Sequence, residues 1–130
     1  SHHFNNDDVT IRKKIEKFNE LISMHEETIA NPLLNYIANN KNLKLIGKDK
    51  IIDKNRAPTI SFTHNEKTSK EISDKLIANN IATRNDNFYA WRCLEALGIN
   101  TDDGVIRLSL THYNSKNDVD RVISALETIN

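Results

Sequence analysis

The sequence predicts an α+β domain with one small, mostly antiparallel sheet and helices packed on one of its faces. Apolar residues recur every three or four positions near both ends of the chain, which predicts helices there. Between them, short segments alternate apolar and polar residues, as is typical of strands buried on one face only. With 130 residues, of which 38% are hydrophobic, the chain has the size and composition of one folded domain.

The first predicted helix runs from Asp8 to about Asn40. Proline removes a backbone donor, so we expect Asn31-Pro32 to produce a kink or to divide the segment into two helices. Residues 1–7 lack an apolar core and are predicted to be a disordered, tag-like start. The apolar face of the helix consists of Ile11, Ile15, Phe18, Ile22, Ile29, Leu33 and Ile37.

The remaining elements follow from alternation, capping signals and glycines. Thr68-Ser69-Lys70-Glu71 is a capping box that opens a second helix, which ends at Asn79-Asn80. A short helix over residues 89–97 is closed by Gly98, and Asn114 or Ser115 caps a last helix. The charged stretch 48–57 is predicted to be a surface loop. Strands are predicted at residues 43–46, 58–64, 81–84 and 105–111.

Charge and cysteine content exclude several classes of function. The chain has 18 basic and 18 acidic residues, interspersed along its length, so we expect neither a nucleic-acid partner nor an acidic membrane partner. A single cysteine, Cys93, cannot form an internal disulfide, and the apolar runs are too short to span a membrane. The histidines lack the spacing of metal ligands, so no metal site is predicted. A cytoplasmic protein is the expectation.

The most informative segment is residues 104–115, a short strand followed by a turn into the last helix. Alternation places Ile106, Leu108 and Leu110 on one face and Arg107 on the other, with Val105, Ser109 and Thr111. A guanidinium held on a rigid strand suits a carboxylate, which it binds through two parallel hydrogen bonds. The alternative interpretation is an ordinary arginine on a solvated strand face.

Four segments also resemble a known family. They are residues 24–27 (Met-His-Glu-Glu) with Leu33-Leu34 and 43–47, residues 56–62, residues 80–90, and residues 104–115 with 118–121. In this order they resemble the C-terminal small domain of the class V aminotransferase superfamily. These are pyridoxal-phosphate (PLP) enzymes, and the most similar branch is the cysteine desulfurases.

The resemblance implies that residues 8–130 are a single C-terminal small domain of a larger PLP-dependent enzyme whose large, PLP-binding domain is absent. The full-length enzyme would use PLP, act on an amino acid and form a homodimer. Its large domain would belong to the same polypeptide and supply the lysine that holds PLP. The fragment alone would bind no cofactor and would be inactive. The best match to the family's Ser-x-His-Lys sequence, residues 63–67, has the wrong spacing and is interpreted as a solvated turn.

The resemblance also assigns substrate-binding roles. Arg107 would bind the α-carboxylate of the amino acid, and Arg84 would help to hold the substrate or line the pocket entrance, the alternative being a surface salt bridge. Asn87 lies in the same loop, and His112 could reach the domain interface.

Tyr89 stands where a cysteine desulfurase has its nucleophilic cysteine. A phenol cannot accept sulfur as a persulfide, so desulfuration of that kind is not expected, and this chain contributes no catalytic residue. Tyr89 would donate a hydrogen bond or wall off the pocket, or else pack against Trp91 or Phe88. Cys93 is interpreted as a small buried hydrophobic residue rather than an activated thiolate.

A second hypothesis needs no cofactor. The composition equally suits a free-standing α+β module for binding or oligomerisation, without catalytic activity.

Overall fold

The computed structural model describes residues 3–129, and it describes their side chains from residue 10 onward. The order of helices and strands agrees with the sequence prediction. Along the chain the elements are α1 (His3–Asn39), β1 (Leu43–Ile46), β2 (Thr59–His64), α2 (Ser69–Ala78), β3 (Arg84–Asp86), α3 (Trp91–Ala96), β4 (Val105–Ser109) and α4 (Lys116–Ile129).

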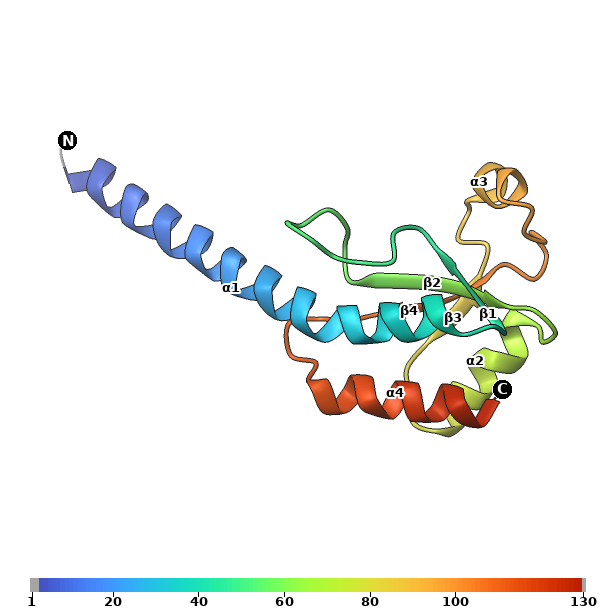
Figure 1. Cartoon of the computed structure of the whole chain (residues 1–130). Helices are drawn as coiled ribbons and strands as arrows, with labels where there is room; N and C mark the ends of the chain where they lie inside the picture. Colours follow the sequence, from blue (N-terminus) through green and yellow to red (C-terminus); the bar gives the residue numbers. More distant parts are fainter. Residues whose placement is uncertain (1–2, 130) are drawn as a thin grey trace.

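The four strands form one antiparallel sheet in the order β1-β2-β4-β3. Helices α1, α2 and α4 form a layer against one face of this sheet, and the short α3 stands apart from that layer (Figure 1). The predicted α+β class, with a small antiparallel sheet and helices packed on one face, is confirmed.

The core lies between the sheet and the helical layer. Ile60 and Phe62 of β2 and Ile106 of β4 are fully buried, as their alternation predicts. Val105 is the exception, because alternation places it on the polar face whereas its side chain is only 4% exposed. The outer face of the sheet therefore contains polar residues with one buried valine.

Helix α1 runs without a break through Pro32, so the predicted division into two helices is wrong. The Asn31 side chain is bound by the loop after β1: its Nδ2 donates to Ile51 O at 3.1 Å, and Ile51 N donates to its Oδ1 at 2.8 Å. Ile51 is 3% exposed, so the loop predicted to lie on the surface contributes a core residue. Tertiary packing of α1 outweighs the single hydrogen bond that proline removes.

The N-terminal prediction falls partly outside the described residues. Residues 1–2 of the predicted tag-like start are not described, and α1 begins at His3, earlier than the predicted Asp8.

Several element boundaries differ from the prediction, and β4 ends at Ser109 rather than at residue 111. The strand predicted at residues 81–84 is β3, at Arg84–Asp86, because Ile81 N donates to Leu76 O at 3.0 Å and so remains tied to the end of α2. Helix α3 begins at Trp91 rather than Tyr89, because Tyr89 has a positive φ of 60°. The predicted capping box of α2, with Thr68 and Glu71, is confirmed.

Candidate functional site

Arg107 lies in the middle of β4, on the sheet face that the helical layer leaves uncovered. In the antiparallel register it is directly opposite Ser61 of β2 on one side and Arg84 of β3 on the other. Residues directly opposite each other in an antiparallel pair lie on the same face with their Cβ atoms about 4.5–5.5 Å apart. The fold therefore places two arginines, 23 residues apart in the sequence, side by side.

The Arg107 guanidinium carbon lies 4.0 Å from the centre of the Phe88 ring. This cation–π contact orients the guanidinium without neutralising its charge. Sequence reasoning missed Phe88 as part of the site, since only the tertiary structure brings the loop after β3 over β4.

Neither arginine has an acidic partner among the described side chains. The ion pairs there have Arg12, Lys70, Lys116 and Arg121 as their cations. The alternative interpretation of Arg84 as half of a surface salt bridge is therefore wrong for the described part of the chain. Asp86 is the nearest acid in the register, but its Oδ1 accepts a hydrogen bond from Asn87 N at 2.7 Å and pairs with neither arginine.

The two arginines line one open pocket of about 240 Å³, together with Ala82, Thr83 and Ser109. The Thr83 hydroxyl donates to Arg107 O at 3.1 Å and so connects the segment before β3 to β4 at this pocket. Positive charge that lacks a carboxylate partner, in a pocket with hydroxyl groups, can bind an anion.

Gly104 sets how closely β4 approaches β3. Its φ is +69°, and a Cβ at this position would collide with the Asp86 carbonyl group. The glycine allows the turn before β4 to lie directly against the end of β3. The side-by-side placement of Arg84 and Arg107 depends on this approach.

The loop after β3 holds Asn87 and Tyr89, and it does not bring them into the pocket. Asn87 Oδ1 accepts from Tyr89 N at 3.0 Å, and Asn87 Nδ2 donates to Thr101 O at 3.4 Å, so this amide shapes the loop. Phe88 and Tyr89 have positive φ values of 50° and 60°. Tyr89 is 94% exposed, so the alternative in which it packs against Trp91 or Phe88 is wrong.

His112 and Cys93 also lie outside the arginine pocket. His112 is exposed and contacts Tyr113 edge-to-face, with ring centres 5.3 Å apart. Cys93 in α3 is exposed, so its interpretation as a small buried hydrophobic residue is wrong. Helix α3 stands apart from the helical layer (Figure 1), and Leu94 is its buried residue.

Residues 63–67, predicted to form a solvated turn, include the last two residues of β2 and an exposed turn at Asn65 and Glu66. His64 is 9% exposed rather than solvated, and its Nδ1 accepts from the backbone N–H groups of Glu66 and Lys67, both at 3.1 Å. These bonds fix the proton on Nε2, and burial lowers the pKa of the imidazole, with Lys67 adding to the shift.

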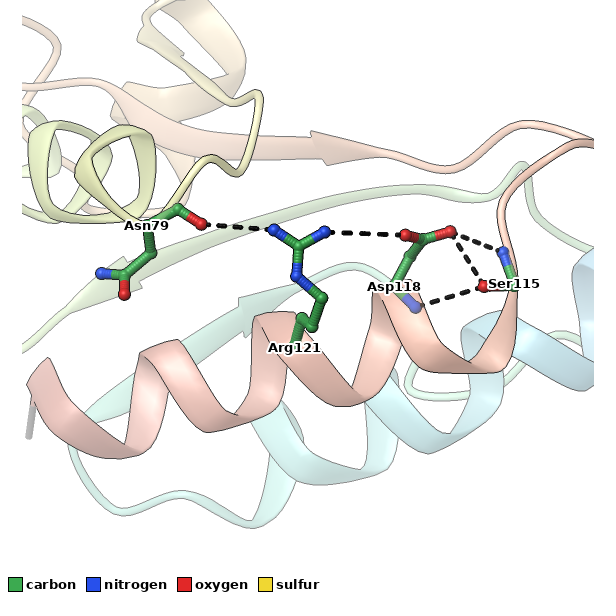
Figure 2. Close-up of polar contacts among 4 residues, drawn as sticks. All are labelled: Asn79, Ser115, Asp118 and Arg121. Carbon is green, nitrogen blue, oxygen red and sulfur yellow. Dashed lines mark hydrogen bonds and ion pairs between the residues drawn. The ribbon is translucent and has the colours of Figure 1, made fainter.

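A second pocket, of about 320 Å³, lies between the end of β4, the start of α4 and the segment after α2. Figure 2 shows polar contacts of Asp118 and Arg121, which line this pocket: Arg121 donates to Asn79 O at 3.4 Å and lies 3.9 Å from the Asp118 carboxylate. Asp118 also accepts from Ser115 N at 2.8 Å, and this bond is the main reason why the pKa of Asp118 is lowered. Ser115, not Asn114, accepts from the first turn of α4. These side chains satisfy one another, unlike Arg84 and Arg107.

Between residues 3 and 129, no helix is both long and apolar enough to cross a bilayer. In the same range no three histidine, cysteine or acidic side chains are grouped so that they could hold a metal ion.

Residues 13–122 match the family model "Aminotransferase class-V", which covers most of the sequence. The chain belongs to the class V aminotransferase family. The aminotransferase-like protein FGM3 of Gibberella zeae is 30% identical over 111 residues, or 85% of this chain and 28% of that protein. The chain thus spans less than a third of this relative's length.

Solved structures show the same fold. The cysteine desulfurase CsdA of Escherichia coli matches with a TM-score of 0.68 at 20% identity, over 82% of this chain and 25% of that one. A cysteine desulfurase of Thermococcus onnurineus matches with a TM-score of 0.69 at 20% identity, over 82% of this chain and 25% of that one. The resemblance predicted from four sequence segments is confirmed at the level of family and fold.

Proposed function

We propose that this chain is the C-terminal small domain of a PLP-dependent enzyme and that Arg107 binds the α-carboxylate of its amino acid substrate. The observation that carries the proposal is the half-buried Arg107 guanidinium, fixed by a strand and by Phe88 and left without a carboxylate partner among the described residues. A carboxylate would satisfy it through two parallel hydrogen bonds. Holding the substrate in one orientation lowers the entropic part of the barrier.

The residues of this chain fit the substrate rather than the cofactor. No lysine is among the described residues that line the arginine pocket. A lysine of a large domain in the same polypeptide would therefore hold PLP. When bound, PLP supplies an electron sink for reactions at the α-carbon of an amino acid. This chain's part is to bind the carboxylate and to cover one side of the site.

A large domain would also account for the exposed first half of α1. Ile11, Ile15, Phe18, Leu21 and Met24 are each more than half exposed, along a helix that projects from the sheet (Figure 1). Contiguous exposed apolar surface of this kind is typical of an interface. The full-length enzyme would be a homodimer, and Asn87, Tyr89 and His112 would reach its substrate only from the rim of the site.

The test is Arg107→Ala in the full-length enzyme encoded with this domain. Losing a charge-assisted bidentate contact should raise KM for the amino acid at least tenfold and lower kcat. Arg92→Ala, an exposed arginine outside the pocket, is the matched control and should change neither constant. Unchanged KM and kcat for Arg107→Ala would refute the carboxylate role.

The coding sequence upstream of Asp7 offers an independent test. A reading frame that continues into a domain with Ser-x-His-Lys supports the proposal. A start codon at the first residues would favour the free-standing binding module.

A further inference from the structure

The arginine pocket is lined by two guanidinium groups, so its positive charge exceeds the single negative charge of one carboxylate. Arg84 and Arg107 are opposite each other in the β3–β4 register, and no described acidic side chain pairs with either of them. Like charges directly opposite each other on neighbouring strands destabilise a sheet. A ligand with two negative groups would remove this repulsion, whereas a ligand with one would leave an unpaired guanidinium.

We propose that this pocket takes an amino acid with an acidic side chain, such as aspartate or glutamate, with one carboxylate on each arginine. The inference rests on the proposed function, because it assigns the α-carboxylate to Arg107. Arg107 is half-buried and fixed by Phe88, which suits the group common to all amino acid substrates. Arg84 is exposed at the edge of the pocket, where the variable side chain of the ligand would end.

The surrounding residues favour this arrangement. Ser109 lines the same pocket and lies two residues from Arg107 on β4, hence on the same strand face, whereas the Thr83 hydroxyl is used to hold the Arg107 backbone. Asp86, two residues from Arg84 on the same strand, is the group that could compete, but its Oδ1 accepts from the backbone N–H of Asn87 and it forms no ion pair with either arginine. The pocket is open, so ligands of the length of aspartate and of glutamate can both enter, and charge rather than shape sets the preference.

The experiment is a titration of the 130-residue chain, followed by amide chemical shifts at low, fixed ionic strength. L-glutamate is compared with L-glutamine, which has the same length and a neutral side chain, and inorganic phosphate is titrated separately. We expect glutamate to bind about tenfold more tightly than glutamine, with the largest shifts in β3 and β4. Equal affinities, no shift with glutamate, or binding of phosphate alone would overturn the inference.

Variants separate this inference from the proposed function. Arg84→Gln should reduce glutamate affinity to that of glutamine and leave glutamine binding unchanged, while Arg107→Gln should weaken both amino acids. Arg92→Gln, outside the pocket, is the control. If Arg107→Gln weakens both ligands but Arg84→Gln does not discriminate between them, only the acidic-substrate inference fails. If Arg107→Gln changes nothing, the carboxylate role itself fails.

Discussion

The two halves of α1 carry the same apolar periodicity but have different surroundings. In the second half Leu33 and Ile37 are fully buried against the sheet and α4. In the first half, residues 10–24, which we call the arm, Ile15 and Phe18 are 54% and 57% exposed. Figure 1 shows the arm projecting beyond the sheet and the other helices. The comparison teaches that periodicity selects a helix and its apolar face, but not whether that face is covered.

The junction between the halves lies near His25. Its Nε2 is 2.7 Å from Asn114 O, at the turn before α4. Beyond this contact, towards the N-terminus, Ile11, Ile15 and Phe18 are each more than half exposed. Helices in water owe most of their stability to packing of an apolar face, so the arm is the weaker half.

Hydrogen exchange should reveal the largest difference between the halves. Amides of residues 29–37 should exchange only on global unfolding, for which the free energy of a domain is about 5–15 kcal/mol. Amides of the arm should open locally at a free energy closer to zero, because few buried contacts hold them. The measurement is native-state exchange followed by NMR. Uniform protection along α1 would contradict the comparison and would indicate that something covers the arm in solution.

Paired alanine substitutions should show the same contrast. Leu33→Ala removes a fully buried side chain and should lower the free energy of unfolding by about 2–5 kcal/mol. Ile15→Ala, in the arm, should change it by less than about 0.5 kcal/mol. Urea unfolding monitored by circular dichroism measures both. Equal losses in the two variants would show that the arm is packed.

Two glycines test how closely the turn before β4 packs against the end of β3. Gly98 and Gly104 both have φ of +69°, so alanine at either position is disfavoured by about 1–2 kcal/mol. Only at Gly104 does the added Cβ meet Asp86, whereas at Gly98 nothing lies within 4 Å. Gly104→Ala should therefore destabilise the chain more than Gly98→Ala in thermal unfolding. It should also weaken ligand binding, because it separates Arg84 from Arg107.

The smallest expected effect is a pH dependence of the free energy of unfolding. It arises at His64 at the end of β2, not in the arm. The pKa of His64 is lowered from 6.5, so the unfolded chain takes up a proton more readily than the folded one. The His64 contribution to the free energy of unfolding should be constant above about pH 6.5. It should fall as the pH drops from there towards the pKa of His64 in the folded chain. Glu71 and Asp118, whose pKa values are lowered from 4.5 and 3.8, act only at lower pH.

His64→Asn should abolish the loss of stability just below pH 6.5 and keep the loss in the acid range. Unfolding free energies measured from pH 8 to pH 5 check this expectation. A wild-type curve that is flat across this range would contradict it.

The sequence by itself determined the order of elements, the α+β class and most of the core. It also determined the capping box at Thr68 and Glu71, because capping and turn signals are local and depend on a few neighbouring residues. Alternation within one strand placed Arg107 on the polar face, and the resemblance to the class V family selected it as the candidate carboxylate-binding residue.

Only the tertiary structure decided what surrounds these residues. Strand register placed Arg84 opposite Arg107, loop geometry brought Phe88 over the guanidinium, and packing carried α1 through Pro32. It also exposed Cys93 and buried His64. Such outcomes depend on contacts between segments far apart in the chain, and local propensity does not encode them.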